Sequence, residues 1–103
     1  LEYRIVASNT GTDSAVGAIL RDPVPGSTDY VPGSITVNGA SVTDAADGDA
    51  GAFYSGSAEV LAALGTGSLP GGGTLAPGAL STVTFRTTVR DSEPYLMPPV
   101  AAA

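Results

Sequence analysis

The stretch from Ser81 to Arg90 alternates between two kinds of side chain without a break. One face of an extended chain would carry the mostly apolar set Val83, Phe85, Thr87 and Val89, and the other face the polar set Thr82, Thr84, Arg86, Thr88 and Arg90. A period of two residues predicts a half-buried β-strand. Such a strand needs partners, so the rest of the chain has to supply further strands.

Shorter segments of the same kind precede it, separated by turn-forming Gly, Pro, Asn and Asp. Strands are expected over residues 2–8, 15–21, 29–31, 52–54 and 58–64, with a hairpin over 34–42 and a long Gly/Pro loop over 65–78. Asn38-Gly39 favours a two-residue hairpin turn, because both turn residues must adopt a positive φ. Residues 58–64 also fit one or two helical turns, but their shortness and the flanking Gly56 and Gly65 favour a strand. This spacing predicts an all-β fold, an Ig-like two-sheet antiparallel sandwich.

The domain organisation follows from the change in composition near the carboxyl end. Residues 1–90 are predicted to form one Ig-like domain, and residues 91–103 a Pro/Ala-rich tail that acts as a linker or a donor arm. Prolines at 94, 98 and 99 argue against donation, since each lacks an N–H for a strand ladder. If the tail does contact another chain, the expected interface residues are its apolar members, Tyr95, Leu96, Met97 and Val100.

The composition excludes several classes of function. The formal net charge is −6 and the four cations are scattered arginines, which argues against nucleic acid as a partner. The chain has no Cys, His or Lys, so it lacks the thiol, imidazole and amine groups that most nucleophilic and acid–base mechanisms use. No apolar run approaches the roughly 20 residues of a membrane-spanning helix. We therefore expect neither an enzyme nor a membrane-spanning protein.

One loop carries a candidate metal site. Asp44, Asp47 and Asp49 lie within six residues, with Gly48 between them and Gly51 after them. Clustered carboxylates with flexible backbone suit Ca²⁺, which prefers several oxygen ligands at about 2.3–2.6 Å. The spacing is not that of an EF-hand. The alternative is a solvated turn, in which Asp and Gly serve only the backbone conformation.

A series of short motifs then runs along the chain in a fixed order. The motifs are LEYRIV (1–6), NTG (9–11), DPVP (22–25), YVPGS (30–34), LAPG (75–78) and VTFR (83–86). Together they resemble the Ig-like surface repeat catalogued as domain of unknown function eleven, from bacterial and archaeal cell-envelope proteins. The resemblance covers about residues 1–90. It implies a secreted sandwich used in stalks, fibres or adhesins, without catalytic activity.

One departure from that family bears on assembly. Its members commonly continue into a further strand, where this chain has its Pro-rich tail. The departure suggests a sandwich that lacks its last strand, whose open edge would accept a strand from another chain. The donor would be a neighbour's tail or its amino-terminal strand; the alternative is that the tail only links one repeat to the next.

The sequence thus predicts a structural module of an extracellular or cell-surface protein or filament. It would associate end to end with copies of itself or adjacent repeats, by strand donation and with Ca²⁺ as a cofactor. The alternative is an adhesin-type module that recognises a carbohydrate or protein ligand through its loops, especially residues 65–78. A filament subunit polymerises alone, whereas an adhesin stays monomeric and needs a ligand.

Overall fold

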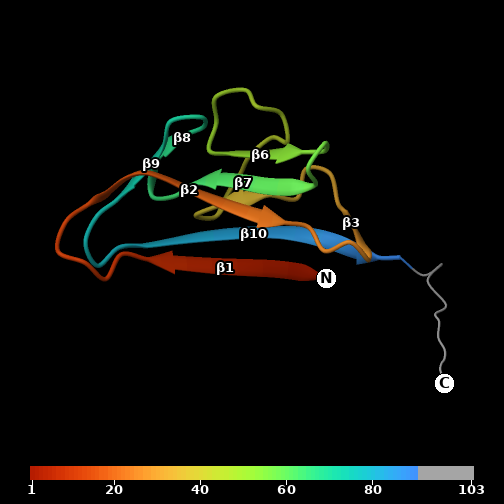
Figure 1. Ribbon diagram of the computed structural model, residues 1–103, viewed down its shortest axis with the longest axis horizontal. Helices are drawn as coiled ribbons and strands as arrows, with labels where there is room; N and C mark the ends of the chain where they lie inside the picture. The colour runs from red at the N-terminus through yellow and green to blue at the C-terminus, as the bar shows by residue number, and fades with distance from the viewer. Residues whose placement is uncertain (91–103) are drawn as a thin grey trace, which may run out of the picture.

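The computed structural model describes residues 1–90, which fold into two antiparallel β-sheets packed face to face and contain no helix (Figure 1). The strands are β1 (Glu2–Ser8), β2 (Ala15–Pro23), β3 (Thr28–Tyr30), β4 (Thr36–Val37), β5 (Ala40–Ser41), β6 (Gly51–Tyr54), β7 (Glu59–Ala63), β8 (Thr66–Ser68), β9 (Gly72–Leu75) and β10 (Leu80–Val89). The predicted all-β two-sheet sandwich is confirmed. Residues 59–63 form a strand, not the alternative helix.

The first sheet has the order β1-β10-β4-β5, and β3 pairs with the far end of β10. The long alternating strand β10 is therefore its centre, with β1 along one side and β3 and β4 along the other. The second sheet has the order β6-β7-β2-β9-β8. In this sheet β2 pairs with β7 from Ile19 to Pro23 but meets β9 only between Ala15 and Ala18, across a register shift.

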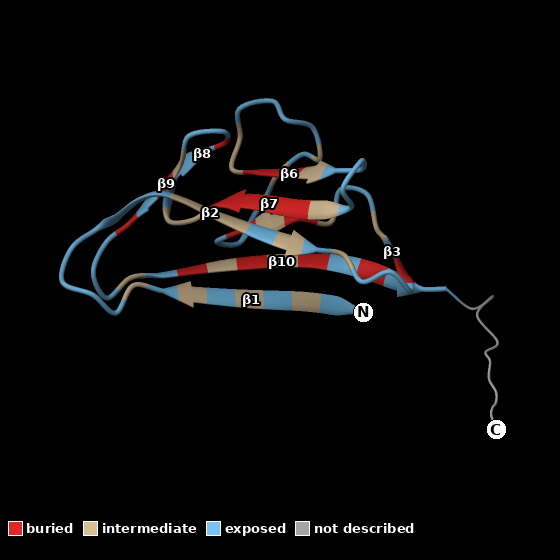
Figure 2. Ribbon diagram, viewed as in Figure 1, coloured by how far each residue is buried: buried red, intermediate tan, exposed pale blue. Residues whose placement is uncertain are grey.

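The core lies between the sheets and is built on the inward face of β10. Val83 and Phe85 are fully buried there and pack against Ile35, Val60 and other apolar side chains of the opposite sheet and loops (Figure 2). The ring of Tyr3 meets Phe85 edge-on with ring centroids 5.1 Å apart. Burying large apolar side chains is the main favourable term in folding, so this cluster carries much of the stability.

The predicted hairpin turn at Asn38-Gly39 is confirmed. Asn38 and Gly39 have φ values of 52° and 84° and join β4 to β5. Both values are positive, as a type I′ turn requires. The side-chain Oδ1 of Asn38 also accepts a hydrogen bond from Ser81 Oγ (3.1 Å), which fixes the turn against β10.

The prediction of a long loop over residues 65–78 is wrong, because β8 and β9 form a hairpin inside it. Because the side chains of β8 and β9 are mostly small, no alternation of apolar residues marks these strands in the sequence. The close packing explains the glycines: a Cβ at Gly73 would lie 1.8 Å from the carbonyl oxygen of Leu64. Only glycine allows this approach.

The tail, with the interface predicted at Tyr95, Leu96, Met97 and Val100, lies outside the described residues. Within residues 1–90 no helix is long and apolar enough to cross a membrane.

Candidate functional site

The strand β1 forms an open edge of the first sheet. It pairs with β10 over all seven of its residues, and within residues 1–90 no strand pairs with its other side. The other edge strands in this part of the chain are shorter: β5, β3, β8 and β6 have two, three, three and four residues. A long unpaired edge is a template for another strand. Among residues 1–90, β1 is therefore the longest edge available for pairing with another strand.

The hydrogen bonds at the two ends of β1 show which backbone groups face outward. The N–H of Thr87 donates to the carbonyl of Leu1 (2.9 Å). Eight residues further, the N–H of Asn9 donates to the carbonyl of Ala79 (3.1 Å). In an antiparallel pair such bonded positions alternate with positions whose N–H and C=O point away from the partner. The outward positions of β1 are therefore Glu2, Arg4, Val6 and Ser8.

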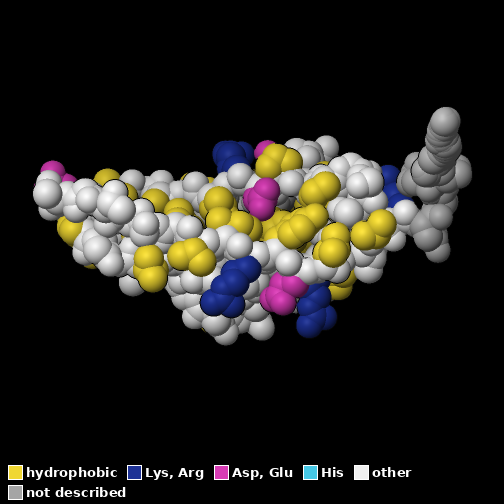
Figure 3. All heavy atoms as spheres, turned by 90° about the horizontal axis from the view of Figure 1, so that it is seen from below, with side chains coloured by type: hydrophobic (Ala, Val, Ile, Leu, Met, Phe, Trp, Pro, Cys, Tyr) yellow, Lys and Arg dark blue, Asp and Glu magenta, His cyan; other side chains and the backbone are white. Residues whose placement is uncertain are grey.

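A groove of about 350 Å³ runs beside this edge, between the two sheets. Tyr3 and Ile5 line it from β1, and Pro23 and Pro25 line it from the end of β2 and the turn that follows. Figure 3 shows a band of apolar side chains on this side of the molecule, with arginine and acidic side chains beside it and within it. Because β9 covers only the beginning of β2, the sandwich stays open here.

The groove also contains charged groups, and the residues of β1 determine whether its edge can pair. Arg4 and Asp22 also line it, and partial burial raises the pKa of the Asp22 carboxyl. The edge strand contains no proline, lysine or register shift to block pairing, and its charged side chains are those of Glu2 and Arg4. The side chain of Val6 is 53% exposed on the outer face. The surface thus combines unpaired backbone groups with an apolar groove, which are the two parts of a strand-accepting site.

The acidic loop places its carboxylates in two separate groups. Asp44 turns away from the loop: Oδ1 accepts a hydrogen bond of 2.5 Å from the Tyr30 hydroxyl, and Oδ2 accepts one of 2.9 Å from the N–H of Gly33. Burial, followed by the hydrogen bond and the charge of Asp44, raises the pKa of Tyr30 to about 12. Asp44 therefore ties the loop to the turn after β3.

Asp47 and Asp49 converge on the hydroxyl of Thr43. Thr43 Oγ1 lies 2.6 Å from Asp47 Oδ2 and 3.1 Å from Asp49 Oδ2. Asp49 also accepts the N–H of Thr43 at 2.9 Å and the N–H of Gly51 at 3.1 Å. The bond from the Thr43 N–H is the main cause that lowers the pKa of Asp49. These contacts account for the Asp-rich sequence as a set of backbone caps.

The predicted metal triad is therefore not assembled by residues 1–90. No group of three or more His, Cys, Asp or Glu side chains lies close enough in this part of the chain to hold a metal ion. Asp47 and Asp49 are brought together, and Asp44 is not. Calcium binding stays a prediction, now restricted to two carboxylates, with backbone carbonyls and water left to complete the shell.

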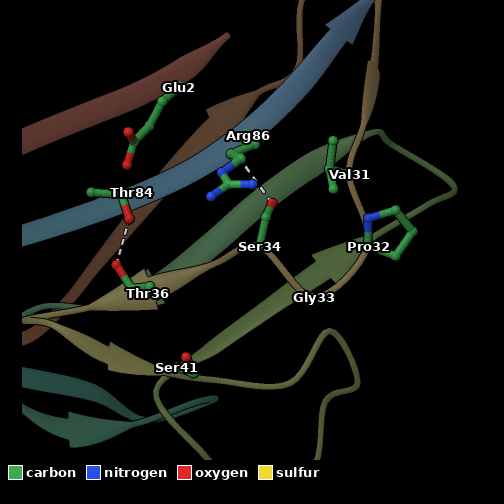
Figure 4. Close-up of a pocket in the computed structure, with 9 residues that line it drawn as sticks. All are labelled: Glu2, Val31, Pro32, Gly33, Ser34, Thr36, Ser41, Thr84 and Arg86. Carbon is green, nitrogen blue, oxygen red and sulfur yellow. Dashed lines mark hydrogen bonds between the residues drawn. The ribbon is translucent and has the colours of Figure 1, made fainter.

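A second hollow of about 310 Å³ opens on the outer face of the first sheet (Figure 4). Hydroxyl groups of Ser34, Thr36 and Thr84 line it, and the guanidinium of Arg86 projects into it. Neither of the two ion pairs found within residues 1–90 includes Arg86. No sequence pattern predicts this hollow, because β4 and β10 bring together residues that are far apart in the chain, such as Thr36 and Thr84, which are separated by 48 positions.

No protein-family model, curated protein or solved structure matches this chain. The resemblance to the surface-repeat family therefore stays a prediction, and any proposal about function depends on the geometry of the sites.

Proposed function

We propose that this chain is a non-enzymatic structural module of an extracellular surface protein or filament, and that it associates with like domains through the open edge of β1. The observation that supports it most is the length of that edge: seven residues, with outward backbone groups at Glu2, Arg4, Val6 and Ser8. Soluble domains usually blunt such edges.

The apolar groove beside β1 is a second observation that supports association through this edge. A strand beside β1 would place every other side chain over Tyr3, Ile5, Pro23 and Pro25, and so bury apolar surface as well as satisfy the backbone. An exposed apolar groove next to an unpaired edge favours a partner that brings an extended segment. The acidic composition and the absence of Cys fit a role outside the cell, as the family resemblance implies.

The proposal is tested by closing the edge without disturbing the ladder. Val6→Pro removes an outward N–H, and the bonds between β1 and β10 do not use that group. Val6→Thr is the matched control, because it keeps the N–H and the branched shape. Mass photometry and negative-stain electron microscopy should show assembly of the wild type and Val6→Thr and monomers of Val6→Pro. Assembly of a folded Val6→Pro, or a wild type that stays monomeric at high concentration, contradicts the proposal.

A ligand-binding module is the second candidate, and the hollow in Figure 4 supports it. Four hydroxyl-bearing residues, Ser34, Thr36, Ser41 and Thr84, and the Arg86 guanidinium offer hydrogen-bond donors and acceptors that suit a carbohydrate or a small anion. Arg86→Ala should abolish binding in a glycan screen if this candidate is right, and leave self-association unchanged.

A further inference from the structure

We propose that the occupant of the β1 groove is the tail of a second copy of this chain, residues 94–100, added as an extended strand. This inference rests on the proposed function, because it names the partner of the same edge. It depends on three observations: the positions of the prolines in the tail, the direction in which β10 leaves the domain, and the length of the tail.

Two of the three tail prolines, Pro94 and Pro98, would lie on the same side of an extended strand. Leu96 and Val100 share that side, so this face of the strand would be wholly apolar. In a strand, residues whose side chains share a face also direct their N–H groups to the same side. If this apolar face enters the groove, the N–H positions of Pro94 and Pro98 point away from β1.

The prolines then do not interrupt pairing. The N–H groups that face β1 then come from the odd positions Glu93, Tyr95 and Met97. Pro99 also occupies an odd position, but it has no N–H to donate. Proline is tolerated in strands when its missing N–H faces solvent, as on an edge strand. The objection that three prolines leave too few donors therefore applies to a strand paired on both sides, and a donated edge strand is paired on only one.

The direction of β10 at its end favours a second copy over the same chain. Arg90 donates its N–H to the carbonyl of Ser27 (3.1 Å), and its Nε lies 2.9 Å from Asp29 Oδ1. Both partners belong to the β3 side of β10, and β1 lies on the opposite side. The last described residue is thus held away from its own β1 edge.

The length of the tail is sufficient for a strand and a connection. Thirteen residues follow Arg90. At about 3.3 Å per residue they extend roughly 43 Å, and covering the seven residues of β1 requires about 23 Å. Several residues are left to bridge two domains.

The experiment uses two neighbouring positions on opposite predicted faces of the tail. In the full chain, Leu96→Glu places a carboxylate in the apolar groove and should weaken self-association at least about tenfold. Met97→Glu is the matched control, since its side chain would face solvent, and it should assemble like the wild type. Equal loss of self-association in both variants, or loss in Met97→Glu alone, overturns the proposed assignment of Leu96 to the groove face and Met97 to the solvent face.

Mixing two blocked chains separates donation between copies from the other arrangements. Val6→Pro has a closed edge and an intact tail, and Leu96→Glu has an open edge and a blocked tail. Each should be monomeric alone, and the mixture should form a dimer that grows no further, as measured by mass photometry. A mixture that stays monomeric overturns donation in trans.

The same data distinguish failure of this inference from failure of the proposed function. If Leu96→Glu assembles like the wild type while Val6→Pro does not, the edge is the interface but the tail is not its occupant. If both variants assemble, the edge itself is not the interface. Should Val6→Pro fail to fold, Val6→Lys is the substitute, since lysine blocks an edge and this side chain is exposed.

Discussion

The hydroxyl of Tyr30 donates a hydrogen bond of 2.5 Å to the carboxylate of Asp44, across 14 positions of sequence. The Tyr30 ring also stacks on Phe53 with centroids 4.1 Å apart. One tyrosine thus joins β3, the acidic loop and β6. The loop that the sequence predicted as a candidate metal site is held in place by Tyr30, an aromatic side chain that packs against the core.

Tyr30 should titrate far above an ordinary tyrosine. Burial and the neighbouring Asp44 raise its pKa to about 12, so the fold favours the neutral form. Its contribution to stability is present below the ordinary value near 10 and is lost as the pH rises through 12. The ultraviolet difference titration between the wild type and Tyr30→Phe should show one late midpoint near 12. A midpoint near 10 would mean that the bond to Asp44 does not form.

Asp49 should stabilise the loop, and more than Asp47 does. Asp49→Asn weakens the caps on the N–H groups of Thr43 and Gly51, and we expect a loss of about 1 kcal/mol at neutral pH because the loop is partly exposed. Asp47→Asn, which affects one exposed contact, is the control. Urea denaturation measures both.

The pH dependence of that loss has a defined sign. The folded pKa of Asp49 lies below its ordinary value of 3.8, so the stabilisation is present above that value and is lost as the pH falls through the folded pKa. The difference in stability between the wild type and Asp49→Asn should therefore shrink below about pH 4. A constant difference down to lower pH would contradict the assigned cause.

Calcium, if it binds, should depend on Asp47 and Asp49 and not on Asp44. Asp44 is engaged with Tyr30 and Gly33, so Asp44→Asn should leave any heat of Ca²⁺ titration unchanged. Asp47→Asn should abolish it, since two carboxylates with one neutralised bind Ca²⁺ poorly. Absence of heat in the wild type, together with a melting temperature that chelator does not change, would leave the loop as a set of backbone caps.

Gly73 should tolerate no side chain. A Cβ there would meet the carbonyl oxygen of Leu64 at 1.8 Å, so Gly73→Ala must displace β9 from the backbone of Leu64 and should cost about 2 kcal/mol or more. Gly26→Ala is the control, because a Cβ at Gly26 has nothing within 4 Å. Thermal denaturation of the two variants should differ by several degrees. Equal melting temperatures would contradict the close approach.

Local patterns predicted the strands well where side chains alternate. The bounds of β1 and the turn at Asn38-Gly39 agree with the sequence prediction because period and turn chemistry are local. The strands β8 and β9 were missed because Gly67 and Gly73 pair by backbone approach, which leaves no apolar pattern. Which strand lies at an edge depends on pairing between distant segments, so the open side of β1 was not predictable from any motif.

The acidic loop shows the same limit in its side chains. Spacing alone groups Asp44 with Asp47 and Asp49, but the orientation of Asp44 is set by Tyr30, which no local pattern connects to it. Sequence reasoning therefore found the right residues for a polar cluster and could not show that they divide into two.

The most direct test of strand pairing at β1 is amide hydrogen exchange, resolved by residue with NMR, at rising protein concentration. Tyr3, Ile5 and Ala7 bond to β10 and should be protected at every concentration. The outward amides of Glu2, Arg4, Val6 and Ser8 should exchange fast in the monomer and become protected as the chain associates. If these outward amides exchange equally fast in the monomer and the assembly, the edge of β1 is not the interface.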